Sequence, residues 1–133
     1  MTLTLLKSKI HRASVTGAVL GYEGSIGICP DLIAAAGFLP WEKVDIYNVT
    51  TGARFSTYVI VGNPGDVCLN GAAARLVQAG DLVIIAAYCQ LDASETVTHI
   101  PTVVLVDSDN KIIPSEPAQP QGGKVTGARL HEV

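Results

Sequence analysis

The stretch Val44–Val61, "VDIYNVTTGARFSTYVIV", decides the fold class of this chain. β-Branched and aromatic residues, which suit strands, occupy both of its halves, and the segment "TGA" between them is typical of a turn. The stretch therefore predicts a β-hairpin, with one strand over Val44–Thr50 and the other over Arg54–Val61.

The rest of the chain also favours strands. Asp81–Tyr88, "DLVIIAAY", is a continuous apolar run of the kind that forms a strand buried on both faces. Strand-forming residues also fill four further segments, Thr2–Ile10, Arg12–Leu20, Thr102–Val106 and Lys111–Ile113.

Only two short helices are expected. Asp31 is predicted to cap the first helix, which Gly37 ends in the left-handed conformation. The second would begin at Gly71, with Asn70 as its N-cap and Gly80 beyond its end. Many short strands with two small helices predict a mainly β domain that closes, or nearly closes, into a barrel.

The composition limits the classes of partner. A chain of 133 residues is expected to be one domain, and 48% hydrophobic residues with a mean hydropathy of +0.36 are apolar for a soluble monomer. Further copies of the chain could cover part of that apolar surface. The net charge of −3 argues against nucleic acid as a partner, because phosphate binding needs a basic surface. Neither a membrane-spanning apolar run nor a signal-peptide pattern is evident, so we expect a cytoplasmic protein without a membrane partner.

Neither cysteines nor histidines form a metal-binding pattern. The cysteines lack CxxC spacing and are expected to be buried, reduced thiols, at Cys29, Cys68 and Cys89. The histidines are scattered without ligand spacing, at His11, His99 and His131. We therefore expect no metal site. Residues 114–133 are rich in Pro, Gly and Gln, and we expect this tail to be disordered.

Gly24 and Ser25, in the segment "YEGSIGI", lie between two runs of strand-forming residues, and their place there needs an explanation. A hairpin turn is the simplest explanation, since glycine supplies positive φ and serine bonds to nearby backbone.

Several polar residues on apolar strands could instead bind a small anion. Lys9 and Arg54 are cationic, Tyr58 can donate a proton near neutral pH, and the helix start "NGAAA" at Asn70 offers free backbone N–H groups to a carboxylate. Each feature also has a structural explanation: a solvated arginine, a tyrosine that suits any strand, and a good helix cap.

Three stretches together resemble the aspartate 1-decarboxylase family, whose members use a pyruvoyl group to make β-alanine. They are "LKSKIHRASVTGAVLGYEGSIGI", "VDIYNVTTGARFSTYVI" and "NGAAARLVQAGDLVIIAAY". The similarity covers roughly residues 3 to 113, so we assign the domain to residues 1–113. The resemblance implies a double-psi β-barrel with short helices, a homotetramer, a cytosolic location and a role in pantothenate synthesis.

The resemblance gives Gly24 and Ser25 a chemical role. The chain would cleave itself between them, leaving residues 1–24 and 25–133, and Ser25 would become a pyruvoyl group. That group would bind the amine of L-aspartate as a Schiff base, without pyridoxal phosphate or a metal. Ser25 and Tyr58 would be the catalytic residues, with Tyr58 as proton donor, and Thr57 would assist the cleavage of the Gly24–Ser25 bond. Whether cleavage needs a maturation factor is left open.

The resemblance also implies which residues bind the substrate. These are Lys9, Arg54, Thr57, Gly71, Ala72 and Ala73, with supporting roles for His11, Tyr22 and Asn70. The chain departs from the common family pattern at Gly21, Cys29, Tyr47 and Arg75. We expect the sole tryptophan, Trp41, to be a packing residue on a loop. An alternative from another class stays open, an unprocessed and non-catalytic β-barrel that serves as a binding or oligomerisation module.

Overall fold

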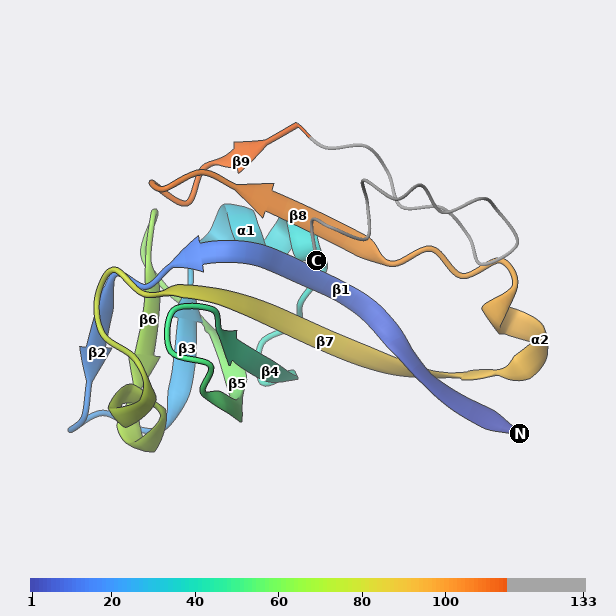
Figure 1. The fold of residues 1–133 in the computed structure, drawn as a ribbon, viewed down its shortest axis with the longest axis horizontal. Helices are drawn as coiled ribbons and strands as arrows, with labels where there is room; N and C mark the ends of the chain where they lie inside the picture. Colours follow the sequence, from blue (N-terminus) through green and yellow to red (C-terminus); the bar gives the residue numbers. More distant parts are fainter. Residues whose placement is uncertain (115–133) are drawn as a thin grey trace.

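The computed structural model describes residues 1–114, which form a mainly β domain with few short helices (Figure 1). The strands of this part of the chain are β1 (Thr2–Ser14), β2 (Gly17–Val19), β3 (Ser25–Ile28), β4 (Lys43–Asn48), β5 (Arg54–Val61), β6 (Val67–Asn70), β7 (Leu82–Asp92), β8 (Thr102–Val106) and β9 (Ile112–Ile113). The helical segments are α1 (Pro30–Ala36), the 3₁₀ helix η1 (Gly71–Leu76) and α2 (Ala93–Thr96). Residues 115–133, and with them nearly all of the predicted tail, lie outside the described part.

Within residues 1–114 the nine strands form one mixed sheet in the order β2-β6-β3-β5-β4-β7-β1-β8-β9. The pairs β2–β6, β3–β5 and β1–β8 are parallel, and the other neighbouring strands are antiparallel. Figure 1 shows the shorter strands gathered beside the two long strands β1 and β7, whose far ends reach toward α2 and the N-terminus. This arrangement is compatible with the β-barrel that we expected.

The predicted hairpin is confirmed, with β4 ending slightly earlier than expected. Tyr47 pairs with Arg54, and the pairing continues to Lys43 opposite Tyr58. The first strand stops at Asn48 because its side-chain oxygen accepts the backbone N–H groups of Thr50 and Thr51 at 3.0 and 3.1 Å. An asparagine that binds the backbone just beyond itself favours a turn over continued pairing.

Two predictions about the strands need correction. The strands predicted over Thr2–Ile10 and from Arg12 onward are not separate, because the single strand β1 continues from Thr2 to Ser14. Its register against β7 shifts between Ile10 and Ala13. Arg12 has a φ of 63° at this bulge, so the strand bends there without ending. The Gly24–Ser25 pair is not a hairpin turn, because β6 lies between β2 and β3 and Ser25 is the first residue of β3.

The two predicted helices form, but their ends differ from the prediction. Cys29, not Asp31, is the N-cap residue of α1, and Asp31 lies in the first turn, where a carboxylate favours the positive end of the helix dipole. Gly37 ends α1 in the left-handed conformation with φ 70°, as predicted. The second helix begins at Gly71 with Asn70 as its N-cap residue, as predicted, but it is a short 3₁₀ helix that already ends at Leu76.

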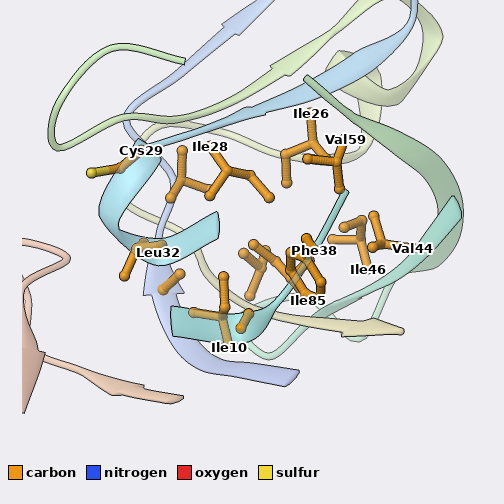
Figure 2. Packing of buried hydrophobic residues seen from close by; sticks show 14 of the residues in the cluster. Ile10, Ile26, Ile28, Cys29, Leu32, Phe38, Val44, Ile46, Val59 and Ile85 are labelled. Carbon is orange, nitrogen blue, oxygen red and sulfur yellow. The ribbon is translucent and has the colours of Figure 1, made fainter. Parts of the chain in front are cut away.

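One continuous core fills the space inside the strands (Figure 2). Alternate residues of β4 point inward, so Val44 and Ile46 are buried while Lys43 is exposed. Figure 2 shows these two side chains facing others from β1, β3, α1, β5 and β7, among them Ile10, Ile28, Leu32, Val59 and Ile85. Each such isoleucine or leucine contributes about 1.5–3 kcal/mol on burial.

The structure also bears on the membrane and metal predictions. Along residues 1–114, every helix is too short to span a bilayer. In the same part of the chain, no three His, Cys, Asp or Glu side chains gather in a way that could hold a metal ion.

Candidate active site

Ser25 is a buried hydroxyl held by an amide. It is 1% exposed and pairs with Asn70 across the antiparallel β3–β6 ladder. The Asn70 Nδ2 group donates to Ser25 Oγ at 3.0 Å, and the Ser25 hydroxyl donates to the Glu23 carbonyl oxygen at 3.2 Å. Asn70 is the N-cap residue of η1, as predicted, but its side chain makes no cap hydrogen bond and binds Ser25.

The backbones of Gly24 and Gly71 approach each other closely. Gly71 has a φ of +65°, and a Cβ added there would lie 2.6 Å from Gly24 Cα and 2.9 Å from the Tyr22 carbonyl oxygen. Gly24 itself is not in the left-handed region, and a Cβ added to it would meet nothing within 4 Å. A hairpin turn at Gly24 and Ser25 would have used the positive φ that glycine allows. In the structure it is Gly71 that adopts the left-handed conformation, which favours glycine.

A cavity of about 350 Å³ opens beside Gly24. The parallel β3–β5 register pairs Ile26 with Val59, so continuing it backward brings Gly24 beside Thr57. The residues that line the cavity are Gly24, Phe55, Ser56, Thr57, Tyr58, Ala72, Ala73 and Leu76. The structure thus gathers four predicted site residues (Thr57, Tyr58, Ala72 and Ala73) around the Gly24–Ser25 bond.

Arg54 lies on the outer face of the same hairpin. It is exposed, it does not line the cavity, and its guanidinium carbon is 4.4 Å from the centre of the Tyr47 ring. Tyr58, further along the hairpin where it pairs with Lys43, is half-buried, and its ring centre lies 5.9 Å from that of the exposed Trp41. Trp41 lies between α1 and β4, as predicted, but it packs on a site residue and not in the core.

The structure does not bring Lys9 and His11 to this cavity within one chain. Both are buried on β1, which is separated from β5 by β4 and β7 in the sheet. His11 lines a different cavity of about 540 Å³, together with Arg12 and residues of β7, β8, β9 and the β8–β9 turn. Tyr22 is 59% exposed, and only its carbonyl oxygen is placed close to Gly71.

Two titratable groups close to these residues have shifted pKa values. Burial, the hydrogen bond with Tyr88 and the charges of Tyr88 and Asp45 raise the pKa of Tyr47 well above its usual range. Burial, helped by the Asp66 charge, raises the pKa of the Cys68 thiol, whose sulfur donates to Asn70 Oδ1 at 3.6 Å. Both groups are therefore neutral around pH 7.

Sequence reasoning missed several residues of this region. Phe55, Ser56 and Leu76 were not singled out as cavity residues, although Phe55 and Ser56 lie between the predicted Arg54 and Thr57. The contact of Tyr47 with Arg54 could have been found from the hairpin register, because the two residues pair directly. Tyr88 could not, since its contact with Tyr47 depends on the distant pairing of β4 with β7.

Chemically, the arrangement combines the buried Ser25 hydroxyl, a glycine carbonyl beside it and a cavity lined by three hydroxyl-bearing residues, Ser56, Thr57 and Tyr58. Such a set suits attack of a hydroxyl on its neighbouring peptide bond, because the amide of Asn70 restrains the nucleophile and excluded water strengthens polar contacts.

Comparison with known proteins gives a consistent result. A family model described as aspartate decarboxylase matches residues 1–113. A protein of Bdellovibrio bacteriovorus named aspartate 1-decarboxylase is 63% identical over 112 residues, which cover 84% of this chain and 90% of that protein. Proteins of the same name from Caldicellulosiruptor saccharolyticus and Caulobacter vibrioides are 57% and 56% identical, over 85% and 84% of this chain and 90% and 97% of their own lengths. The chain therefore belongs to the aspartate decarboxylase family.

Proposed function

We propose that this chain cleaves itself between Gly24 and Ser25 and then decarboxylates L-aspartate to β-alanine and CO₂, which serves pantothenate synthesis. The observation that carries the proposal is the set of contacts around Ser25. Its buried hydroxyl accepts a hydrogen bond from Asn70, and the preceding residue, Gly24, packs on Gly71 and lines a cavity. Membership of the aspartate decarboxylase family supports the reaction and its substrate.

Cleavage would begin with the Ser25 hydroxyl. Its oxygen attacks the carbonyl carbon of Gly24, the C–N bond breaks, and the hydroxyl proton passes to the freed nitrogen, which converts the amide into an ester. The negative charge on the carbonyl oxygen needs a hydrogen-bond donor, a role for the Thr57 hydroxyl, since Thr57 lines the cavity with Gly24. Loss of the Ser25 α-proton then expels the Gly24 carboxylate, and water replaces the nitrogen of the resulting dehydroalanine, which leaves as ammonia.

The surroundings of residue 25 fit the pyruvoyl group that remains. Asn70 could donate to a carbonyl oxygen at residue 25 as it now does to Ser25 Oγ, and the cavity beside Gly24 leaves room for a small substrate. Such a group supplies an electron-withdrawing carbonyl that accepts an amine and takes up the electrons released with CO₂. Pyridoxal phosphate and metal ions have no part in this proposal.

The chain's own side chains would bind and protonate the substrate. Arg54, which lies outside the cavity of its own chain, would hold a carboxylate through a two-pronged contact at a site completed by a neighbouring copy, and the Tyr58 hydroxyl would deliver a proton to the carbon that loses CO₂. Tyr58 lies in the cavity wall, where its hydroxyl can reach a ligand bound next to Gly24. The backbone of Gly71, Ala72 and Ala73 supplies further polar contacts.

A homotetramer would complete the site. Lys9 and His11 lie on β1, away from the cavity of their own chain, so a neighbouring copy is the source from which they could reach it. Exposed apolar side chains offer surface for that association, among them Leu20, Leu39, Val61 and Val97. Light scattering on purified protein tests the assembly, and a stable monomer at micromolar concentration would count against this part of the proposal.

Intact-mass analysis combined with an assay for β-alanine tests the reaction itself. We expect fragments 1–24 and 25–133, the second without a free amino terminus, and β-alanine formed from aspartate. Ser25→Ala should stay one chain and be inactive, while the matched control Ser94→Ala, at an exposed residue of α2, should behave as the unmutated protein. An unmutated chain that stays intact after prolonged warming would overturn the proposal and favour the non-catalytic module.

A further inference from the structure

Three side chains that contact one another, Tyr47, Arg54 and Tyr88, lie on the outer face of β4, β5 and β7. These strands run side by side in the sheet (Figure 1). The Arg54 guanidinium lies 4.4 Å above the centre of the Tyr47 ring. The hydroxyl oxygen of Tyr47 is in turn 2.7 Å from that of Tyr88, across the β4–β7 pair. The three side chains thus form a chain of contacts from β7 to Arg54.

The carboxylate of Asp45, on the same face, has hydrogen-bond partners other than Arg54. Asp45 Oδ1 accepts a hydrogen bond from Ser56 Oγ at 2.7 Å, and Oδ2 lies 3.5 Å from the Tyr47 hydroxyl. Within residues 1–114, Arg54 forms no salt bridge, and its guanidinium stacks on the Tyr47 ring. Because no acidic side chain of residues 1–114 pairs with it, this exposed guanidinium can take an external carboxylate.

Stacking on a ring leaves the donors of the guanidinium available. The face of the planar group contacts the aromatic ring, while its N–H groups point outward along its edge, where a carboxylate can bind two of them. The ring must itself be held for this to orient Arg54. The Tyr88 hydroxyl does so, because a hydrogen bond of 2.7 Å fixes the outer end of the Tyr47 ring.

We propose that Tyr88 is a positioning residue that sets the affinity for the substrate carboxylate, acting through the Tyr47 ring on Arg54. The inference rests on the proposed function, because it assumes that Arg54 binds a carboxylate of aspartate. Tyr88 does not touch the substrate. It restricts Arg54 to the orientation that binding needs, so that less conformational freedom is lost when the carboxylate arrives.

Tyr88→Phe tests this role, since it removes one hydroxyl and keeps the ring. We expect the KM for aspartate to rise roughly threefold to tenfold, the range that one neutral hydrogen bond supports, with kcat unchanged. Tyr47→Phe should have the same effect, and the double variant should be no worse than either single variant, because all three lose the same hydrogen bond. Tyr47→Leu should weaken binding further, since the ring is lost as well.

Binding of succinate gives a measurement that does not depend on decarboxylation. Succinate keeps the two carboxylates of aspartate and lacks the amine, and its affinity can be measured by titration calorimetry on the purified protein. We expect Tyr88→Phe to weaken succinate binding by the same factor as it raises KM. Gln90→Ala, at the next exposed residue on the same face of β7, is the matched control and should change neither quantity.

The outcomes separate the two proposals. Unmutated protein that makes no β-alanine contradicts the proposed function, whereas succinate titration still measures the effect of Tyr88→Phe. If Tyr88→Phe alters neither KM nor succinate affinity, or lowers kcat alone, Tyr88 does not position Arg54. Additive effects of Tyr47→Phe and Tyr88→Phe would likewise overturn the inference, because each hydroxyl would then act separately.

Discussion

Gly71→Ala separates a packing requirement at the cleavage site from ordinary backbone strain. Gly71 has a φ of +65°, where an alanine costs roughly 1–2 kcal/mol. Its new Cβ would also lie 2.6 Å from Gly24 Cα and 2.7 Å from Gly24 N, closer than atoms approach without moving. Because both contacts are with backbone, relief requires a shift of Gly24 relative to η1, which adds roughly 1–3 kcal/mol.

Gly37→Ala is the matched control. Gly37 has a φ of +70°, nearly that of Gly71, and a Cβ there would meet nothing within 4 Å. The control therefore carries the strain without the collision. We expect it to lose roughly 1–2 kcal/mol of unfolding free energy and Gly71→Ala to lose about 2–5 kcal/mol. Chemical denaturation at one fixed protein concentration measures both values, since assembly contributes to stability.

Cleavage gives the sharper comparison. Restoring an ordinary contact of 3.4 Å from 2.6 Å moves Gly24 Cα by about 0.8 Å, and a misplacement near 1 Å can cost about 100-fold in rate. We expect Gly71→Ala to be cleaved at least tenfold more slowly than Gly37→Ala, as followed by intact mass over time. Equal cleavage rates for the two variants would refute the view that the Gly24–Gly71 contact positions the bond.

Three further predictions concern neighbouring side chains. Asn70→Leu removes the amide that donates to Ser25 Oγ, so cleavage followed by intact mass should slow roughly threefold to tenfold; an unchanged rate would exclude a role for this hydrogen bond. Tyr58→Phe keeps the ring beside Trp41, so cleavage should survive while β-alanine production at saturating aspartate falls about 10²–10⁴-fold; retained production would remove Tyr58 as the proton donor. Because burial raises the pKa of Cys68 above its ordinary value of 9.0, its thiol should react with iodoacetamide at pH 8 more slowly in the folded than in the urea-unfolded protein; equal rates would contradict the shift. The stability that this shift contributes is fully present below pH 9.0 and is lost as the pH rises through the pKa of the folded state, which denaturation at several pH values can follow.

Local patterns predicted the parts of the fold that depend on neighbouring residues. The β4–β5 hairpin follows from alternation on both sides of a short turn, and the end of α1 follows from Gly37. The bulge at Arg12 could not be predicted in the same way, because it is defined by the register of β1 against the distant strand β7. Local propensity carries no information about such a shift.

The site was predicted in part for a similar reason. Resemblance to a family named Ser25, Thr57 and Tyr58, but it did not show that the Asn70 side chain binds Ser25 and makes no cap hydrogen bond to η1. The two residues are far apart in the sequence and meet only through the pairing of β3 with β6. Likewise the position that requires a glycine is Gly71 and not Gly24, since this depends on which backbone each residue faces.

The same strand pairing assembles both contacts of the cleavage site. In the β3–β6 ladder Ser25 pairs with Asn70, and one step beyond it Gly24 meets Gly71. The register of this ladder is fixed by side chains remote from the chemistry, because Ile26 and Ile28 on β3 are fully buried, as are Val67 and Leu69 on β6.

A slip of one residue in this ladder would separate both contacts at once. Ser25 would then face Leu69 or Gly71 in place of Asn70, and the side chains of β6 would exchange their inward and outward positions, which the buried core opposes. Substitutions that enlarge the core at Ile26 or Leu69 should therefore impair cleavage more than their effect on stability suggests. Under the proposed function, the buried core of β3 and β6 therefore fixes the position of Ser25 together with the hydrogen bond from Asn70.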